Sequence, residues 1–239
     1  RPLDKAAGAT GVCENPGGFI WASERTGFRH LYLYDADGCL VRPLTQGAWM
    51  VDDIVAVDQA RSLVYFTATR ASPLDRHLYV VSFSGDAIRQ ITRDPGMHQV
   101  VIDHGHQRFV DTYHALDHPP TVTLRDLGTG EVLSVIYDEC DPRVEALALQ
   151  PPELVTLENR GGIKLHGAIY RPPARFRPGP YPTIVQVYGG PHAQLVTRGW
   201  TMTVAMRAQY LARQGFLVFV LDNRGSSRRG LAFEGVIKH

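Results

Sequence analysis

The residues best suited to chemistry lie in segment 187–191 (Val-Tyr-Gly-Gly-Pro), which closes the apolar run Thr183–Tyr188. Open α/β sheets place their active sites at the C-terminal ends of such strands. The two glycines let the backbone approach a ligand closely. The Tyr188 hydroxyl could donate a hydrogen bond to the oxyanion of a tetrahedral intermediate, a contribution of roughly 3 kcal/mol. The segment also fits a plain strand-end turn with Tyr188 packed as core, and spacing alone favours this second role.

A second glycine-rich segment, residues 221–230 (Leu-Asp-Asn-Arg-Gly-Ser-Ser-Arg-Arg-Gly), follows the next apolar run. Its Gly-x4-Gly spacing resembles a phosphate-binding loop, but Leu231 stands where that loop requires lysine. Its arginines have neither the interleaved aromatic residues nor the basic helix of a nucleic-acid surface. We predict no nucleotide and no nucleic-acid partner, and expect these arginines to pair with carboxylates: Arg224, Arg228 and Arg229.

Two histidine pairs raise the question of a metal site. They stand at positions 104/106 and 114/118, and no carboxylate or cysteine falls at ligand spacing beside them. We therefore interpret them as histidines of surface loops. No metal and no cofactor are expected.

A serine nucleophile is not evident. The G-x-S-x-G elbow occurs nowhere in the sequence. Ser226 and Ser227 lie in a glycine-flanked loop but lack that pattern, and no convincing Ser/His/Asp set is present. If the protein is a hydrolase, its nucleophile lies outside these residues.

The first 140 residues are rich in short strands bounded by turn residues. His30-Leu31-Tyr32 recurs as His77-Leu78-Tyr79, and Leu44-Thr45 recurs as Ile91-Thr92, both at an offset of 47 residues, with a weaker third copy between Phe109 and Gly128. A period of 40–50 residues made only of short strands indicates β-propeller blades. The predicted strands are Phe19–Ser23, His30–Tyr34, Ile54–Val57, Leu63–Thr67, His77–Phe83, Arg108–Thr112 and Thr121–Asp126.

The pattern changes after Pro151-Pro152. Glu153–Glu158 and Lys164–Tyr170 flank a turn and predict a hairpin. The nearly continuous apolar run Thr183–Tyr188 predicts a strand buried on both faces. With a helix over Val204–Arg213 and an apolar strand over Phe216–Leu221, it predicts a βαβ unit of a parallel sheet.

The fold predicted is therefore the C-terminal blades of a β-propeller (residues 1–150) followed by the start of an α/β-hydrolase domain (residues 151–239). The charge composition also changes in this region. Residues 171–239 carry ten Lys or Arg against two Asp or Glu, while the chain as a whole has a net charge of only +1. Three blades cannot close a ring, and the chain begins at Arg1 rather than Met. We expect that further chain precedes and follows these residues.

The amino-acid composition narrows the class of protein. The 239 residues are 44% hydrophobic and 21% charged, with 23 Gly and 16 Pro, which excludes a disordered or collagen-like chain. No apolar run is long enough to span a bilayer. The three cysteines form no CxxC, and there is no N-x-[ST] sequon, which favours a cytoplasmic location.

Several ordered motifs resemble the dipeptidyl peptidase IV branch of the prolyl oligopeptidase family. In the first half they are the run from Phe19 to Tyr32, Ser72-Pro73-Leu74 ahead of His77, Phe109-Val110-Asp111, and Pro119-Pro120. In the second half they are segment 187–191, Leu221-Asp222-Asn223-Arg224-Gly225, and residues 229–235. The resemblance covers nearly the whole chain.

This resemblance implies a serine exopeptidase that removes dipeptides from N-termini with Pro, or less readily Ala, in second position. It implies an eight-bladed propeller packed over an α/β-hydrolase domain, peptide substrates with a free N-terminus, and a homodimer. By motif position it makes Tyr188 the oxyanion-hole tyrosine, which reverses the preference from spacing. The family's triad Ser, Asp and His, and the glutamate pair that holds the substrate's N-terminus, have no counterpart in this sequence.

Two alternatives stay open. One is a non-catalytic, propeller-based binding protein, and the other is an acylaminoacyl peptidase or oligopeptidase of the same family. We expect the 239 residues alone to be inactive and poorly soluble, because open strand edges and apolar sheet faces would be exposed.

Overall fold

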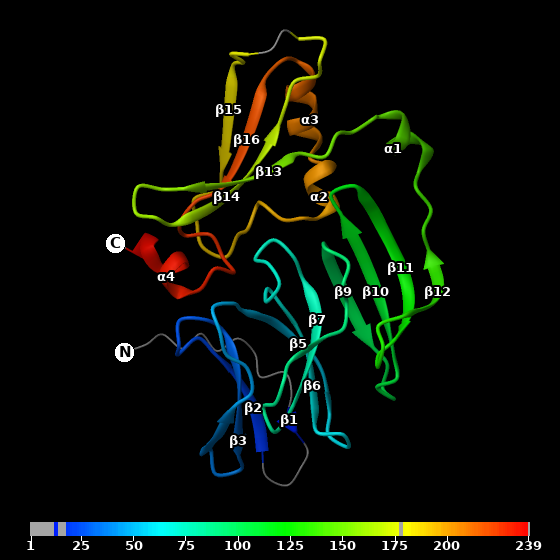
Figure 1. The fold of residues 1–239 in the computed structure, drawn as a ribbon, viewed down its shortest axis with the longest axis vertical. Helices are drawn as coiled ribbons and strands as arrows, with labels where there is room; N and C mark the ends of the chain where they lie inside the picture. The colour runs from blue at the N-terminus through cyan, green and yellow to red at the C-terminus, as the bar shows by residue number, and fades with distance from the viewer. Residues whose placement is uncertain (1–11, 14–17, 177–178, 239) are drawn as a thin grey trace.

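A computed structural model of the chain describes residues 12–13, 18–176 and 179–238. Three four-stranded antiparallel sheets follow one another along the chain and occupy the lower part and right side of Figure 1. In each sheet the strands pair in chain order, as in a propeller blade. The first blade contains β1 (Val12–Cys13), β2 (Gly18–Ser23), β3 (His30–Asp35) and β4 (Leu40–Pro43); the second β5 (Val51–Asp58), β6 (Leu63–Ala68), β7 (His77–Ser82) and β8 (Arg89–Gln90); the third β9 (Met97–Ile102), β10 (Arg108–Ala115), β11 (His118–Asp126) and β12 (Val132–Tyr137).

The repeat at an offset of 47 residues has a physical basis. In the first blade the Thr45 hydroxyl accepts a hydrogen bond from the Leu31 N–H at 2.9 Å and lies 3.0 Å from the His30 Nδ1. In the second blade Thr92 makes the same two contacts, with Leu78 and His77 at 3.0 and 3.2 Å. The histidine and the threonine thus tie the third strand of each blade to the end of the fourth, which explains why these residue types recur at this spacing.

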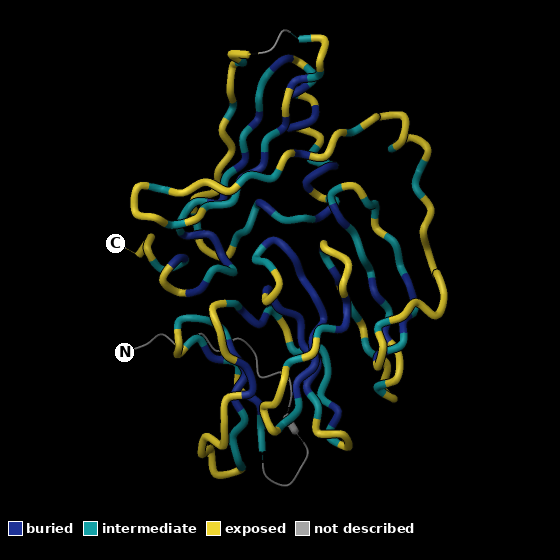
Figure 2. The backbone as a smooth tube through the Cα atoms, viewed as in Figure 1, coloured by how far each residue is buried: buried dark blue, intermediate teal, exposed yellow. Residues whose placement is uncertain are grey.

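The second blade is buried on both faces because it lies between the other two. Successive residues of a strand point to opposite faces, so Phe66 packs toward the first blade while its neighbour Tyr65 packs toward the third. In Figure 2 the two middle strands of the second blade, β6 and β7, are mostly dark blue, whereas β5 is largely of intermediate burial. The blades therefore share two continuous hydrophobic cores.

A fourth sheet of mixed topology follows the blades. It contains β13 (Glu153–Glu158), β14 (Lys164–Tyr170), β16 (Leu217–Asp222) and β15 (Thr183–Val187), in that spatial order. β13 and β14 form the predicted hairpin, and β15 and β16 pair in parallel, as the predicted βαβ unit requires. Its helices are α2 (Trp200–Thr203) and α3 (Met206–Arg213); α1 (Pro142–Ala146) precedes the sheet, and α4 (Leu231–Glu234) and the 3-10 helix η1 (Gly235–Lys238) follow it.

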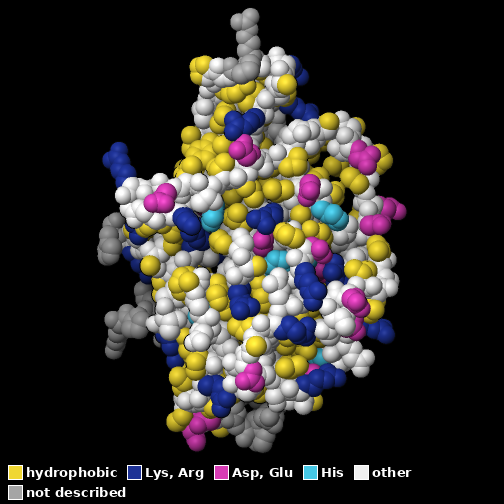
Figure 3. All heavy atoms as spheres, viewed as in Figure 1, with side chains coloured by type: hydrophobic (Ala, Val, Ile, Leu, Met, Phe, Trp, Pro, Cys, Tyr) yellow, Lys and Arg dark blue, Asp and Glu magenta, His cyan; other side chains and the backbone are white. Residues whose placement is uncertain are grey.

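The helix predicted over Val204–Arg213 is α3, which begins two residues later, at Met206, and ends at Arg213 as predicted; the short helix α2 before it was not predicted. One expectation about this sheet is wrong. The run Thr183–Tyr188, predicted to be buried on both faces, is largely exposed, with Val185 59% accessible. The reason is that β15 is the edge strand of the sheet and pairs among the described residues only with β16. Figure 3 shows hydrophobic side chains gathered over this upper part of the molecule.

The helices of the described ranges are all too short or too polar to cross a membrane.

Candidate active site

Tyr188 directly follows β15, at the C-terminal end of that strand of the fourth sheet. Val187, the last residue of β15, pairs in parallel with Leu221 of β16, so the loops that follow the two strands leave the sheet side by side. The Tyr188 side chain is 63% exposed, and its hydroxyl has no hydrogen-bond partner among the described residues. The core-packing role that spacing alone favoured is therefore not what this side chain does. A free phenolic hydroxyl at a strand end is available to a ligand.

The glycines after Tyr188 set its position. Gly189 has φ +75°, a left-handed conformation that favours glycine. A Cβ atom built on Gly190 would lie 2.8 Å from Cε1 of the Tyr188 ring. The ring therefore folds back over Gly190, and the Gly-Gly pair is a steric requirement of this arrangement.

The loop from Tyr188 to α2 is fixed from the sheet side by Asp222. Its carboxylate accepts hydrogen bonds from the backbone N–H groups of Leu195 (2.8 Å) and Val196 (2.9 Å). Burial raises the pKa of Asp222, while these two N–H groups and the charge of Arg229 oppose the shift. The last residue of β16 thus holds the loop that follows β15.

The blades fix the same loop from the other side through the segment Ser72–Arg76, between β6 and β7. The Arg198 N–H donates to the Leu74 carbonyl at 2.9 Å, and the Arg198 guanidinium lies 3.2 Å from the Asp75 carboxylate. The Leu74 side chain packs among buried residues of the fourth sheet, its helices and the loop before α2, including Ala168 and Val196. A residue of the second blade is therefore built into the core of the neighbouring unit.

The three arginines of segment 221–230 differ in their partners. Arg228 makes the predicted pairing with a carboxylate, its Nε lying 2.8 Å from Oδ1 of Asp52 on β5. Arg224 and Arg229 instead donate to the backbone carbonyls of Ala232 and Lys164, at 3.3 and 3.1 Å. Among the described residues neither forms a direct ion pair with a carboxylate, because their side chains lie against α4 and the first residue of β14, although the charge of Arg229 still acts on Asp222.

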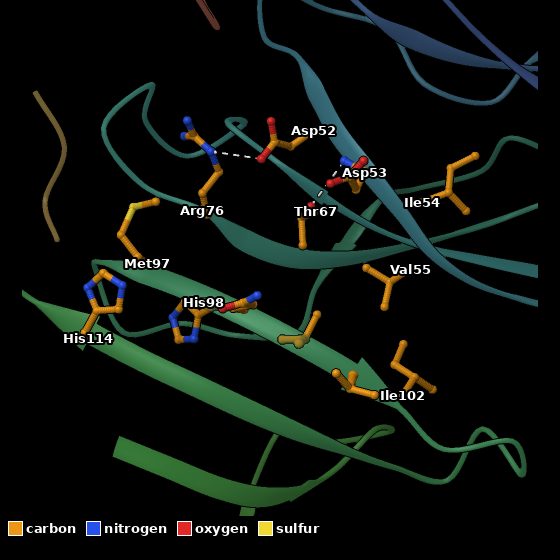
Figure 4. Close-up of a pocket in the computed structure, with 13 residues that line it drawn as sticks. Asp52, Asp53, Ile54, Val55, Thr67, Arg76, Met97, His98, Ile102 and His114 are labelled. Atoms are coloured by element: carbon orange, nitrogen blue, oxygen red, sulfur yellow. Dashed lines mark hydrogen bonds and ion pairs between the residues drawn. The ribbon is translucent and has the colours of Figure 1, made fainter. Parts of the chain in front are cut away.

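An open cleft of about 650 Å³ lies between β5 and β9 of the second and third blades. Figure 4 shows polar side chains at one end, Asp52, Arg76, His98 and His114, and apolar side chains at the other, Ile54, Val55 and Ile102. Tyr188 is not among its lining residues, but the polar end is where Arg76 reaches the Tyr188 loop. The cleft offers an extended ligand both hydrogen bonds and apolar contact.

The histidines of this region are held by the fold. His98 has a partner at each ring nitrogen: Nδ1 lies 2.9 Å from the Asp111 carboxylate, and Nε2 lies 2.9 Å from the Asp94 carbonyl. His114 accepts the Trp200 N–H on Nδ1 at 3.0 Å, and burial, with the nearby His98, lowers its pKa. Each of these imidazoles already has a structural partner.

The histidine pairs considered as metal ligands differ from expectation in part. His114 and His118 lie in β10 and β11 rather than in a loop, whereas His104 and His106 occupy the turn between β9 and β10. Among the residues that the structure describes, no group of three or more His, Cys, Asp or Glu side chains is arranged to hold a metal ion.

Comparisons with known proteins agree on one family. Residues 7–120 match the family model described as "Dipeptidyl peptidase IV (DPP IV) N-terminal region". Mouse dipeptidyl peptidase 8 is 35% identical over 92% of this chain, and a probable dipeptidyl peptidase 4 of Aspergillus flavus is 31% identical over 92%. The crystal structure of Porphyromonas gingivalis dipeptidyl peptidase 4 matches with a TM-score of 0.82 and 27% identity over 92% of this chain. The chain spans only 29% of the length of those two relatives and 31% of that structure.

Proposed function

The chain belongs to the dipeptidyl peptidase IV family, and from that premise we propose that the full-length protein is a serine exopeptidase in which Tyr188 completes the oxyanion hole. It releases dipeptides from free N-termini, with Pro, or less readily Ala, in second position. The observation that carries the proposal is the exposed Tyr188 hydroxyl, free of partners among the described residues, at the end of β15 beside the end of β16.

The chemistry follows the serine-peptidase template. A serine outside this chain attacks the carbonyl carbon of the substrate's second residue, and a histidine takes its proton. The carbonyl oxygen becomes an oxyanion, to which the Tyr188 hydroxyl donates a hydrogen bond. The C–N bond then breaks, the histidine protonates the leaving amine, and water hydrolyses the acyl-enzyme. A donor preorganised at the oxyanion lowers the barrier because it need not reorient as charge develops.

The blades contribute the wall beside this chemistry. The cleft between β5 and β9 has the size and the mixed lining that a short peptide requires. We infer that it forms part of the path that admits peptide substrates.

The test uses the full-length enzyme and the substrate Gly-Pro-anilide. Tyr188→Phe removes one hydroxyl and is expected to lower kcat by about 10²–10³-fold. Tyr210→Phe is the matched control, because the Tyr210 ring on α3 is equally exposed (63%) and lies on a different element. A fall in kcat of less than about tenfold for Tyr188→Phe contradicts the assignment.

The alternatives within the family separate on substrate. An exopeptidase that binds a free ammonium group leaves N-acetyl-Gly-Pro-anilide intact, whereas an acylaminoacyl peptidase or oligopeptidase cleaves blocked substrates. A binding protein without a nucleophile cleaves neither. A homodimer and a cytoplasmic location complete the proposal, and sedimentation of the full-length protein and cell fractionation test them.

A further inference from the structure

The Tyr188 loop is joined to the second blade by the side chain of Gln194. Its Oε1 accepts a hydrogen bond from Nη2 of Arg76 at 2.6 Å, and its Nε2 donates to the Pro73 carbonyl at 2.8 Å and to the Val196 carbonyl at 3.1 Å. Both ends of the amide are used, so the orientation of Gln194 is fixed by its partners. Six residues after Tyr188, the loop is tied to a blade.

Arg76 is the residue at which three parts of the molecule meet. Its backbone bridges to the third blade, donating to Gly96 O at 2.9 Å and accepting from the His98 N–H at 3.1 Å. Its guanidinium is 4% exposed and reaches both Gln194 and Asp52. Burial and the nearby Arg228 lower the pKa of Arg76 to about 10, against the charge of Asp52, so the side chain is still cationic at neutral pH.

Asp52 holds two arginines from two different loops. Its Oδ2 lies 3.3 Å from Nε of Arg76, the pair marked in Figure 4, and its Oδ1 lies 2.8 Å from Nε of Arg228. Burial on its own would raise the pKa of Asp52, but the hydrogen bond from Arg228 and the charges of Arg228 and Arg76 bring it below the usual value. The buried Asp52 carboxylate is therefore stabilised in its charged form by the two arginines.

The two connections start from the two strands of the βαβ unit. Gln194 belongs to the loop after β15, which begins with Tyr188, and Arg228 belongs to the loop after β16. Both loops are thus fastened, through one carboxylate, to the same point on β5. A displacement of the second blade against the fourth sheet would move both.

We propose that Asp52 and Arg76 are positioning residues for Tyr188: through Gln194 and Arg228 they fix the two strand-end loops against the second blade and so hold the tyrosine hydroxyl where the oxyanion forms. The inference rests on the proposed function. A donor displaced by about 1 Å loses much of its effect on rate, so a rigid attachment of this loop matters for turnover more than for binding.

The test is a double-mutant cycle in the full-length enzyme with Gly-Pro-anilide. Asp52→Asn and Gln194→Met are each expected to lower kcat by about 10- to 100-fold with little change in KM. In a Tyr188→Phe background neither should lower kcat further, because the donor they position is gone. Asp37→Asn, the same change in the exposed turn between β3 and β4, should leave kcat unchanged.

Three results overturn the inference. They are unchanged kcat in Asp52→Asn and Gln194→Met, losses that multiply with that of Tyr188→Phe, and losses that appear in KM alone. Should Asp52→Asn fold poorly, Gln194→Met carries the test, because it leaves the buried ion pairs intact. If Tyr188→Phe itself has no effect on kcat, it is the proposed function that fails, and the two failures are therefore distinct.

Discussion

Leu74 is a hydrophobic link between the second blade and the fourth sheet, and removing it tests whether that junction supports the Tyr188 loop. The side chain is 7% exposed and belongs to a buried cluster whose other members include Ala168, Val196 and Ala208, which are small and held by a strand, a fixed loop and a helix. These neighbours have little freedom to fill a void. Leu74→Ala should therefore cost about 3 kcal/mol, within the usual range for a cavity of this kind.

The assay is hydrogen exchange in the full-length protein, read on peptides that cover residues 194–204. The N–H groups of Leu195, Val196 and Arg198 are bonded to Asp222 and to Leu74 itself, so they exchange when the junction opens. A loss of about 3 kcal/mol raises their exchange rate by roughly 100-fold. Leu40→Ala, an exposed leucine of β4, serves as control. If the two variants accelerate exchange equally, or Leu74→Ala does so by less than about fivefold, the reasoning about the junction is wrong.

Two further predictions concern the site and the blades. Gly190→Ala places a methyl group 2.8 Å from the Tyr188 ring, which is exposed and can swing aside. The displaced ring should lower kcat about tenfold or more, while the melting temperature stays unchanged. An unchanged kcat would count against the proposed role of the ring. His77 is buried, and burial, with the charge of His98, lowers its pKa from 6.5 to about 4. Between pH 6.5 and about pH 4, His77 therefore binds a proton in the unfolded chain but not in the folded chain. Because of this difference, the free energy of unfolding should fall by about 2 kcal/mol from pH 7 to pH 5. Thermal unfolding at both pH values should show that loss reduced in His77→Gln and retained in the exposed-site variant His104→Gln.

The blade architecture could be predicted from the sequence because its signals are local. Short strands rich in β-branched and aromatic residues, with His30 and His77 repeating 47 residues apart, reflect contacts made within a single blade. The hairpin after Pro152 and the parallel pair that follows it were accessible for the same reason.

The parts that could not be predicted depend on distant chain segments. The exposure of β15 depends on which strand lies at the edge of the sheet, and its apolar composition does not reveal that. Asp222 binds backbone groups 26 and 27 residues earlier in the chain, and Arg76 binds a side chain 118 residues later. No residue type or spacing in the sequence predicts such contacts, so the residues that hold the Tyr188 loop could be identified only from the structure.

The position of Tyr188 was predicted from its place at a strand end, and its role as an oxyanion donor is the central claim. The most direct measurement compares the affinity of wild-type, Tyr188→Phe and Tyr210→Phe full-length enzyme for a Gly-boroPro inhibitor, whose tetrahedral adduct with the serine mimics the transition state. Tyr188→Phe should weaken inhibitor binding by about the same factor, 10²–10³, by which it lowers kcat/KM, with little change in KM for Gly-Pro-anilide. Inhibitor binding that is equally tight in Tyr188→Phe and Tyr210→Phe would contradict the central claim.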